Sequence, residues 1–340
     1  MGAPLTQPIE GPVRRGLRTK ELMHRLRPGD VALIAHSDLD ELAAQELAAR
    51  RIVAVLDTED AATGRIPNRG PAVLIGAGIA LVDRLGGEVW NQVSEGQPVR
   101  VLHGRVIHGR SVLAHGRRLT PDELVSIEAR ARQDLPSTVA DFARNTLLRA
   151  SEELDLLSWE CPLAGRGMVS EGRPCVVVAR GPGYRKDFAW IARRLGGAAG
   201  VGLIAVDGAA DLALEAGWRP DVIVGDMDSV SDKALSAGSM LVAHASPEGD
   251  CPGSERLRSL ALPHEVMACR GTSVDAALLL AEAQGADPVI GVGMARGPLD
   301  FLEKGRFGMA STMLVRFRLG DRLIDSRGFR ALDDLVRRAP

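Results

Sequence analysis

The chain of 340 residues contains few aromatic residues, which make up 3% of it and include a single tyrosine, Tyr184. Its cores must therefore be built mainly from Ala, Val, Leu and Ile, as in α/β sheets. The 42 basic residues are nearly balanced by 44 acidic ones, so the net charge is only −2. Because nucleic-acid-binding proteins usually carry a marked positive surface, we expect no nucleic-acid partner.

Cysteine is also scarce, and the chain has no C-x-x-C pair. The four cysteines are Cys161, Cys175, Cys251 and Cys269. Their spacing does not fit a disulfide framework or a zinc site. Cys175 and Cys269 lie in apolar, strand-like runs, where a buried free thiol is the usual state. We therefore expect reduced cysteines, as in the cytoplasm.

Long apolar runs are absent, since no stretch approaches the roughly 18 apolar residues that a membrane helix needs. Residues 1–30 also lack the apolar core of a signal peptide. These absences predict a cytoplasmic protein without a transmembrane segment. What is present is an ordinary globular composition, with 45% apolar and 25% charged residues. The 340 residues are enough for two or three domains.

Residues 29–120 are predicted to form an N-terminal α/β domain that follows a flexible arm, residues 1–28, rich in Pro, Gly and Arg. Residues 38–51 show the apolar spacing of a helix between two strands, and glycines mark later hairpin turns. The expected strands are 29–34, 52–56, 99–102, 105–108 and 111–114, with a further apolar segment at 72–77. The pattern is a βαβ unit followed by a β-meander.

This order is similar to the swivelling phosphohistidine domain of phosphoenolpyruvate-utilising enzymes. That family needs a histidine in the loop after the second strand, where this chain has Thr63, Gly64 and Arg65. The phosphotransfer role is therefore expected to be absent. Arg65 and Asn68 remain candidates for binding a phosphate or a partner, and a solvated turn is the alternative.

Residues 121–170 read as a helical linker of one or two helices that starts at Pro121, with an interruption at Pro136-Ser-Thr138 where a second helix would begin. This segment is a candidate surface for a homodimer, and packing on its own domain is the alternative. Residues 171–326 then alternate strands with helices, which predicts a Rossmann-like αβα domain with a mainly parallel sheet. Residues 327–340 form a charged helical tail. The expected strands are 175–179, 203–206, 222–224, 240–243, 265–269, 289–292 and 322–325.

Three aspartates follow two of these predicted strands. Asp207 comes after one strand, and Asp226 and Asp228 come after the next. Ligands of open α/β sheets bind at the carboxyl ends of strands, so these carboxylates are expected to meet. Such a cluster suits Mg²⁺, which prefers oxygen ligands and usually accompanies phosphates. An isolated turn with an N-cap is the structural alternative.

The local pattern around these aspartates supports the same interpretation. Gly225 permits a tight turn, and Asp226 and Asp228, two residues apart, would point the same way from an extended backbone. Ser229 is expected to cap a helix over 232–237. The two histidines bordering strands, His244 and His264, are expected to be surface or capping residues.

A glycine-rich loop, Arg180-Gly-Pro-Gly-Tyr-Arg-Lys186, lies one strand before Asp207. Glycines at the start of a helix favour anion binding, and Arg185 and Lys186 add positive charge. We predict that phosphates contact Gly181, Gly183 and these two side chains. A tight turn without a ligand is the alternative.

At these residues the chain resembles the catalytic domain of thiamine pyrophosphokinases. The segments are Asp207-Gly-Ala and Pro220-Asp-…-Gly225-Asp-Met-Asp-Ser229, over roughly residues 172–326. In that family the usual motif is Gly-Asp-Phe-Asp-Ser, so Met227 is a departure. The resemblance implies Mg²⁺ on Asp207, Asp226 and Asp228, ATP as the donor, and diphosphoryl transfer to thiamine.

The family's other motifs are incomplete here. Its Asp-x-Thr-Asp motif corresponds to Arg270-Gly-Thr272-Ser-Val-Asp275, which keeps Thr272 and Asp275 but lacks the first carboxylate. Its Gly-Gly-Arg-x-Asp-His motif corresponds to a stretch with Asp300 but no histidine. The C-terminal β-sandwich that completes the thiamine pocket has no counterpart. The resemblance therefore implies nucleotide binding, with Thr272, Gly208 and Ser229 as ligands, more firmly than it implies thiamine chemistry. The catalytic residues that it implies are Asp207, Asp226, Asp228 and Asp275.

A resemblance to the SteA family of cytokinetic-ring proteins extends over nearly the whole chain. Its motifs are Gly181-Pro-Gly-Tyr-Arg-Lys-Asp187, Asp207-Gly-Ala-Ala-Asp211, Val224–Ser231 with Gly-Asp-Met-Asp-Ser, Gly271–Asp275, and Phe301–Thr312 with Lys-Gly-Arg-x-Gly-Met-Ala-Ser-Thr. The resemblance implies a role in cell division or cell-wall remodelling, recruitment to the division site, and a division or membrane-anchored partner protein. Many members carry a C-terminal membrane helix, which this sequence does not show.

Three hypotheses for function follow. The first is a cytoplasmic, Mg²⁺-dependent protein of the SteA type that binds ATP or another nucleotide. The second is an active diphosphokinase that transfers diphosphate from ATP to thiamine or another alcohol. The third is a pseudoenzyme whose site binds a nucleotide or partner and signals through its domains. Release of AMP from Mg–ATP in the presence of thiamine distinguishes the second from the others.

Overall fold

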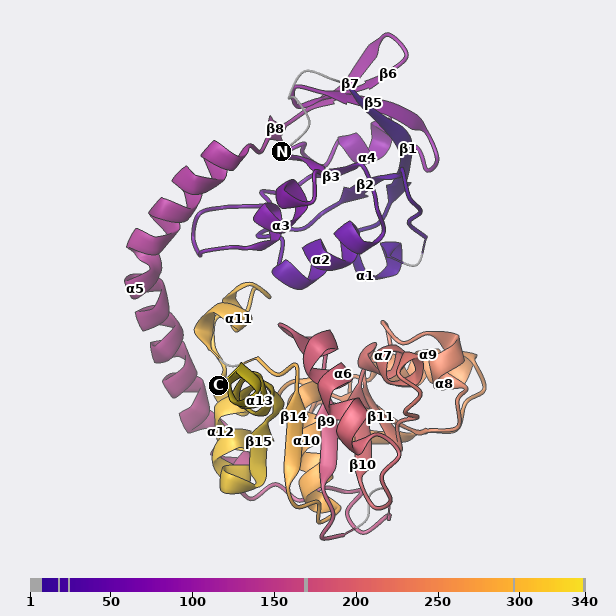
Figure 1. Cartoon of the computed structure of the whole chain (residues 1–340), viewed down its shortest axis with the longest axis vertical. Coiled ribbons are helices and arrows are strands. Elements are labelled where there is room, and N and C mark those ends of the chain that lie inside the picture. Colours follow the sequence, from indigo (N-terminus) through magenta and orange to yellow (C-terminus); the bar gives the residue numbers. More distant parts are fainter. Residues whose placement is uncertain (1–7, 18, 24, 168–170, 296, 339–340) are drawn as a thin grey trace. The chain divides into compact units, whose positions relative to one another are not determined.

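The computed structural model describes residues 8–17, 19–23, 25–167, 171–295 and 297–338 (Figure 1). The chain divides into two units. The N-terminal unit comprises the residues up to 142 together with 298–306, and the C-terminal unit comprises 143–297 and the residues from 307 onward. Both units are α/β, which confirms the predicted fold class at that level.

The N-terminal unit contains a mixed eight-stranded sheet in the order β7-β6-β5-β1-β2-β3-β4-β8. Neighbouring strands from β1 to β4 run parallel, whereas β5, β6, β7 and β8 pair antiparallel. The predicted hairpin turns at Gly104 and Gly109 are present. The strands are β1 Ile9–Arg15, β2 Val31–Ile34, β3 Ala54–Asp57, β4 Ala80–Asp83, β5 Pro98–Leu102, β6 Arg105–His108, β7 Ser111–His115 and β8 Arg117–Arg118.

Strand β1 corrects the prediction of a flexible arm over residues 1–28, which is wrong for residues 9–15. This segment lies between β5 and β2, with Val13 opposite Val31 and Gly11 opposite Val99. A side chain at position 11 would overlap the carbonyl of Gly29, so the glycine permits close packing there. The remainder of the arm includes residues 1–7, 18 and 24, which lie outside the described residues.

Short helices surround this sheet, and the apolar segment 72–77 belongs to one of them. Asp40 caps α2, where its Oδ1 accepts a hydrogen bond from Ala43 N at 2.9 Å. The helices of the unit are α1 Thr19–Leu22, α2 Glu41–Ala49, α3 Gly70–Gly76, α4 Val89–Gln92 and α11 Pro298–Leu302.

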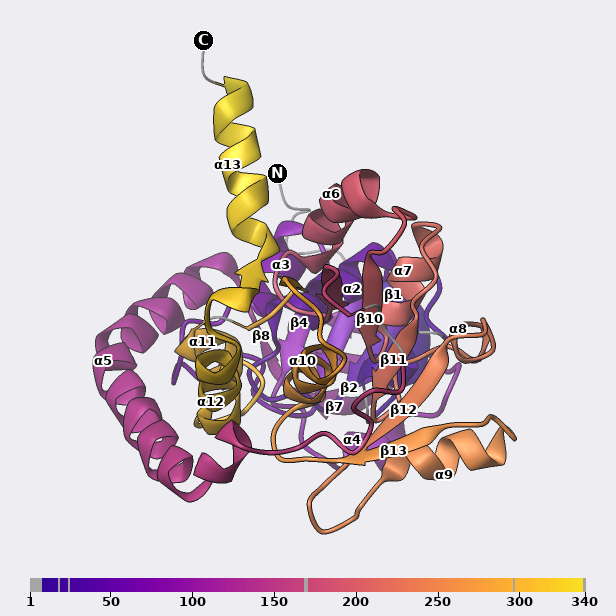
Figure 2. The same ribbon diagram turned by 90° about the horizontal axis from the view of Figure 1, so that it is seen from below.

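Helix α5 (Pro121–Glu152) is continuous in both ribbon views (Figures 1 and 2). The prediction that the helix is interrupted at 136–138 is therefore wrong. A proline inside a helix removes one backbone hydrogen bond. In the same turn the hydroxyls of Ser137 and Thr138 donate to the carbonyl of Asp134, at 2.8 and 3.1 Å. Both hydroxyls are thus satisfied within the helix, one turn back along the chain.

The C-terminal unit contains a seven-stranded sheet in the order β13-β12-β11-β10-β9-β14-β15, and every neighbouring pair is parallel. The parallel sheet predicted from the alternating strands and helices is confirmed. The strands are β9 Cys175–Val178, β10 Gly202–Val206, β11 Val222–Gly225, β12 Met240–Ala245, β13 Glu265–Ala268, β14 Val289–Val292 and β15 Leu323–Asp325.

Helices cover both faces of this sheet. One face packs on α10 and α12, and the other packs on α6, α7, α8 and α9. The sheet reverses its winding between β9 and β14, so the switch point where ligands of open α/β sheets bind lies between these strands. The helices are α6 Tyr184–Leu195, α7 Ala209–Glu215, α8 Asp232–Leu235, α9 Pro252–Ser259, α10 Ser273–Ala283, α12 Ala310–Leu319 and α13 Ser326–Arg338, with 3₁₀ turns η1 Leu154–Leu157 and η2 Gly320–Arg322.

The charged C-terminal segment forms helix α13, which is tied to α6. Arg330 Nε donates to the buried Asp187 at 2.5 Å, and Trp190 Nε1 donates to Asp333 at 2.9 Å. A buried carboxylate held by an arginine makes this contact specific. The segment is therefore part of the C-terminal unit.

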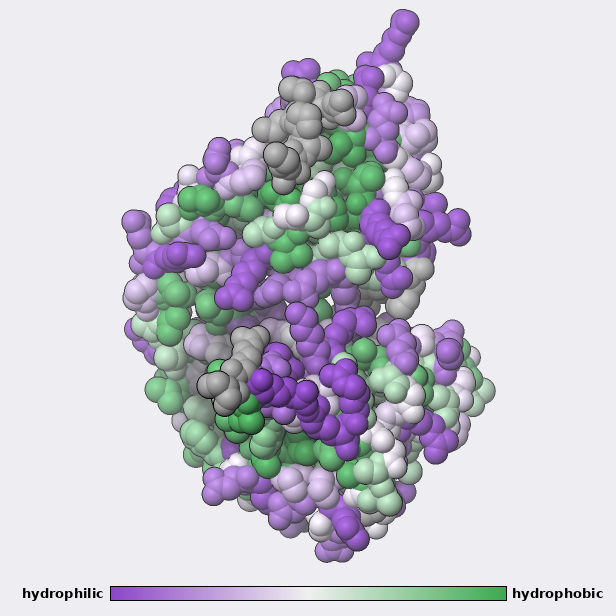
Figure 3. Space-filling view, viewed as in Figure 1, coloured by the Kyte–Doolittle hydropathy of each residue, from purple (hydrophilic) through white to green (hydrophobic). Residues whose placement is uncertain are grey.

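The four cysteines are free, as predicted. Burial raises the pKa of Cys175 and Cys269 to about 12, so both thiols stay protonated near neutral pH. Hydrophilic and hydrophobic residues are interspersed on the surface of each unit that Figure 3 shows. Among the described helices, none is both long and apolar enough to cross a membrane.

Candidate functional site

The predicted site residues of the C-terminal unit follow β9, β10, β11 and β13 at the carboxyl edge of the sheet. At the switch point the loops after β9 and β14 approach each other through glycines. A side chain on Gly181 would overlap the carbonyl of Gly293, and one on Gly293 would overlap the carbonyl of Ala179. Only glycine permits this approach of two backbones.

Asp207 and Gly225 form the closest contact between the two acidic segments. The carboxylate of Asp207 occupies the space that a side chain on Gly225 would fill. Its Oδ1 also accepts a hydrogen bond from Met227 N at 3.2 Å. Asp207 itself has a left-handed backbone, with φ of 49°. The end of β10 is thereby brought against the turn that carries Asp226 and Asp228.

That turn differs from the extended segment expected from the spacing of Asp226 and Asp228. Met227, between them, has φ of 62°, and Asp228 N donates to Asp226 Oδ1 at 3.2 Å. The alternation of an extended strand therefore does not apply, and the two carboxylates are displayed by a tight turn. Met227 is fully buried in the core beneath the turn, which explains an apolar residue between the two aspartates.

Of the two serines after this turn, Ser231 has the capping role that the sequence suggested for Ser229. The prediction that Ser229 caps α8 is wrong, because Ser231 caps it and accepts from Ala234 N at 3.1 Å. Ser229 instead accepts a hydrogen bond from Gly208 N at 3.1 Å. Ser229 and Gly208 thus connect the β10 and β11 ends, one residue beyond Asp207 and Asp228.

The glycine-rich loop leads into α6 with Gly183 as the N-cap residue, at φ of 76° and without a side-chain cap. Arg185 and Lys186 are exposed in the first turn of α6. Arg185 lies 3.7 Å from Glu215 of α7 and over the ring of Tyr184. The N-terminus of α6 therefore presents two cationic side chains at the positive end of the helix dipole, while the N–H groups of Tyr184 and Lys186 donate to carbonyls of the loop itself.

Arg180 is a residue of this site that the sequence did not single out. A side chain on Gly208 would lie 2.7 Å from Arg180 Nη1, so the guanidinium reaches from the end of β9 to the start of α7. It thereby adds positive charge between the glycine loop and Asp207. Its position directly before Gly181 was the only sequence signal for this role.

Thr272 and Asp275 form a capping box at the start of α10. Thr272 Oγ1 accepts from Asp275 N at 3.2 Å, and Asp275 Oδ2 accepts from Thr272 N at 2.9 Å. The same Oδ2 accepts from the hydroxyls of Ser311 and Thr312, each at 3.1 Å. Asp275 is completely buried and joins the N-termini of α10 and α12. The segment ending in Met-Ala-Ser-Thr312 thus has a structural function that its sequence did not reveal.

The acidic residues at the β10 and β11 ends have the donor chemistry that Mg²⁺ prefers, namely several carboxylate oxygens on short loops. Across the ranges that the structure describes, no three His, Cys, Asp or Glu side chains are grouped so as to hold a metal ion as they stand. The carboxylates fit such an ion in donor type, and Asp207 packs directly against the turn of Asp226 and Asp228.

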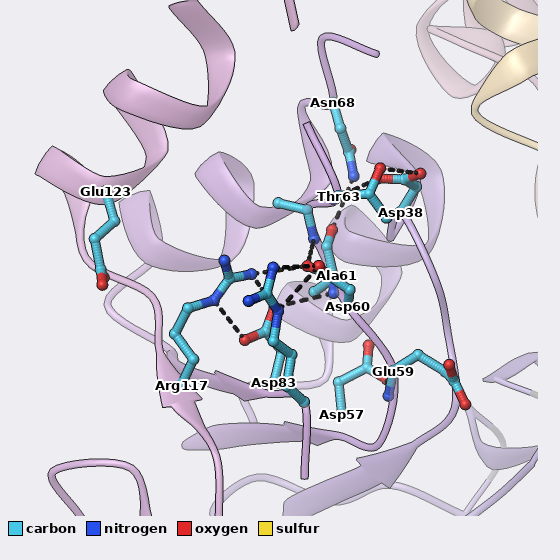
Figure 4. A network of polar contacts seen from close by, with 12 residues as sticks. Asp38, Asp57, Glu59, Asp60, Ala61, Thr63, Asn68, Asp83, Arg117 and Glu123 are labelled. Carbon is cyan, nitrogen blue, oxygen red and sulfur yellow. Dashed lines mark hydrogen bonds and ion pairs between the residues drawn. The ribbon is translucent and has the colours of Figure 1, made fainter. Parts of the chain in front are cut away.

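The N-terminal unit has a second acidic network at the carboxyl ends of β3 and β4 (Figure 4). Arg117 makes two hydrogen bonds to the buried Asp83, from Nε at 2.9 Å and from Nη2 at 2.6 Å, and reaches Asp60 at 2.7 Å. Asp83 also accepts from Ala61 N at 3.0 Å. The network fixes the loop after β3 to the end of β4.

Asp57, at the end of β3, is completely buried in the same unit. Its Oδ1 accepts from the backbone N–H groups of His36 and Glu59, each at 3.0 Å. Burial, assisted by the charge of Asp83, raises the pKa of Asp57 to about 8. The side chain is therefore mainly protonated at neutral pH, which suits a structural group.

The loop over 57–71 is held by its own polar side chains. Asn68, predicted as a candidate ligand, is buried, donates to Ala61 O at 2.9 Å and accepts from Gly70 N at 3.0 Å. That prediction is wrong for Asn68, because its amide is used inside the loop. Thr63 Oγ1 donates to Asp38 at 2.8 Å. Arg65 is exposed.

Comparison of the chain with protein-family models and with curated proteins finds no match.

Proposed function

We propose that this protein binds a nucleotide, ATP or a relative, together with Mg²⁺ at the carboxyl edge of the C-terminal sheet. The observation that carries this proposal is the packing of Asp207 against Gly225, which joins the acidic ends of two adjacent parallel strands. The glycine loop and the N-terminus of α6 follow β9, which is the next strand of the same sheet. Cation ligands and phosphate ligands therefore share one rim.

In this proposal Asp207, Asp226 and Asp228 hold the cation. Mg²⁺ would neutralise the carboxylates and the phosphate oxygens together. The phosphates bind at the positive end of the α6 dipole and to Arg185 and Lys186.

A role in cell division is the second part of the proposal, and it is supported by the sequence resemblance to the SteA family. Four of the five segments that carry this resemblance follow strands at the rim. Gly181–Asp187 forms the loop into α6, and Gly271–Asp275 forms the start of α10. We propose that a division partner protein recognises the nucleotide-bound form of this chain, and that the chain acts as a homodimer.

The proposal is tested by calorimetric titration of the full chain with ATP, with and without Mg²⁺. The wild type should bind only with Mg²⁺, and Asp226→Asn should abolish this binding without loss of folding. Asp250→Asn is the matched control, because Asp250 is exposed in a loop of the same unit. Equal nucleotide affinity of Asp226→Asn and wild type would contradict the proposal.

The products of the reaction distinguish an active diphosphokinase from a protein that only binds the nucleotide. Incubation with Mg–ATP and thiamine should yield no thiamine diphosphate and AMP at ordinary enzyme rates, on the order of 1 per second. The incomplete second motif is the reason, since the acid that would precede Thr272 is Arg270 in this chain. Steady formation of both products at that rate would favour the diphosphokinase.

A further inference from the structure

His244 lies near the end of β12, on the face of the sheet that α10 covers. Its neighbour Val242 belongs to the core shared with α10, and alternation along the strand places residue 244 on the same face. The sequence suggested a surface or capping residue, yet the side chain is partly buried. Gly225 pairs with Ala243 across β11 and β12, so Asp226 and His244 are the next residues along these two neighbouring strands. His244 therefore lies beside the end of β11, where the proposed cation site begins.

The hydrogen bonds of His244 determine which ring nitrogen carries the proton. Nε2 lies 3.1 Å from the carbonyl oxygen of Cys269 and 3.4 Å from its sulfur. A carbonyl oxygen can only accept, so Nε2 must be the donor. In the neutral ring Nδ1 is then a lone-pair acceptor. Burial lowers the pKa of His244, against the opposing influence of Asp275 and Asp226.

Three elements contribute groups around this imidazole. β13 is followed by Cys269, whose carbonyl fixes the tautomer and whose thiol stays protonated. α10 contributes Asp275, whose Oδ2 is used by Thr272, Ser311 and Thr312. The loop after β11 contributes Asp226. Among the described residues, the hydrogen bonds of the ring all involve Nε2, which leaves Nδ1 available to a ligand.

We propose that Nδ1 of His244 is a further positioning group of the nucleotide site, where it accepts a hydrogen bond from the hydration shell of the bound cation. Mg²⁺ dehydrates reluctantly and usually keeps several waters, which donate to nearby acceptors. A cation on Asp226 brings such waters toward His244. A neutral acceptor of fixed tautomer can orient them without adding a further negative charge to the acidic cluster. This inference rests on the proposed function.

Two variants of the full chain separate the two ring nitrogens. In His244→Gln the amide nitrogen corresponds to Nε2 and keeps the donor to Cys269, but no acceptor remains at the Nδ1 position. In His244→Asn the amide oxygen can replace Nδ1 as acceptor, whereas the donor to Cys269 is lost. Calorimetry should show that Gln weakens Mg–ATP binding about twofold to twelvefold, the usual net effect of one hydrogen bond, and that Asn binds nearly as wild type.

Long-range ¹H–¹⁵N NMR of histidine-labelled protein provides a second readout, in which the His244→Gln spectrum identifies the His244 signals. The inference expects a proton on Nε2 at pH 7 and a shift of Nδ1 when Mg–ATP binds. A proton on Nδ1, equal affinity losses in both variants, or no loss in Gln would each overturn it. If the wild type shows no Mg²⁺-dependent nucleotide binding, the proposed function is wrong. In that case the inference about His244 is wrong as well.

Discussion

The two units place aspartates at equivalent positions, the carboxyl ends of adjacent parallel strands, but surround them differently. In the N-terminal unit Asp83 is buried and held by Arg117, and the buried Asp57 has a pKa of about 8. In the C-terminal unit Asp207 and Asp226 accept backbone N–H groups in left-handed turns beside glycine. A carboxylate at a strand end is therefore not by itself a sign of a binding site.

The difference between the units lies in what the following loop can do. The loop after β3 is closed by Asn68, Thr63 and the arginine network, so its polar groups hold the loop in place. Gly181 in the loop after β9 meets the backbone of Gly293, and Gly225 at the end of β11 meets the Asp207 carboxylate. The exposed Arg185 and Lys186 follow the first of these glycines. We expect changes in the first set to alter stability, and changes in the second set to alter ligand binding.

The largest effect is expected from Arg117→Ala, which leaves Asp83 buried without its cation. Breaking a buried ion pair costs about 3–5 kcal/mol, and the free energy of unfolding should fall by that amount. Urea denaturation measures it, with Arg132→Ala as control, since the exposed Arg132–Glu128 pair contributes about 0.5 kcal/mol or less. Nucleotide affinity should stay unchanged. A loss of affinity larger than that of the control would contradict a purely structural role for the network around Arg117.

The next effect concerns pH and Asp57. Its folded pKa of about 8 lies above the ordinary 3.8, so between these values the folded state keeps a proton that the unfolded state releases. The contribution of Asp57 to the free energy of unfolding is therefore full at low pH and is lost as the pH rises to about 8. Between these limits the free energy of unfolding falls with a slope approaching about 1.4 kcal/mol per pH unit. Asp57→Asn should remove this slope.

The measurement is the unfolding free energy at pH 5 and pH 8 for Asp57→Asn, for wild type and for Asp134→Asn. Asp134 is an exposed residue of α5 and serves as the control. A wild type whose stability is as flat between pH 5 and pH 8 as that of Asp57→Asn would show that Asp57 is ionised in the folded protein.

A smaller effect is expected from Gly225→Ala, whose new methyl group would overlap the Asp207 carboxylate. Gly249→Ala is the matched control, because Gly249 also has a positive φ but has open space around it. Both variants incur backbone strain, while only Gly225→Ala displaces Asp207, so its additional destabilisation should be about 2 kcal/mol. In calorimetry Gly225→Ala should also lose Mg²⁺-dependent nucleotide binding, and Gly249→Ala should retain it.

The smallest effect is expected from Lys186→Ala. Loss of one charge-assisted hydrogen bond to phosphate should weaken nucleotide binding about tenfold, or about 1.4 kcal/mol, with little change in stability because the side chain is exposed. Lys233→Ala, another exposed lysine of the same unit, should bind as wild type. If the two variants bind equally, the phosphates do not lie at the start of α6.

The sequence by itself determined the elements whose signals are local. Apolar runs such as Val222–Val224 specify buried parallel strands, since both faces of such strands are covered. Gly225 specified a turn before the acidic pair, and α5 was visible from its helical spacing. The positions of Asp207, Asp226 and Asp228 at strand ends followed from the same pattern.

Only the tertiary structure decided which distant residues meet. The composition of residues 9–15 does not predict a strand, yet these residues form one because they pair with β2 on one side and β5 on the other. Asp275 is tied to Ser311 and Thr312 across 36 and 37 residues, and His244 to Cys269 across 25. These contacts depend on the order of strands in the sheets. Sequence spacing within one element cannot specify that order, because many strand orders bury the same apolar runs.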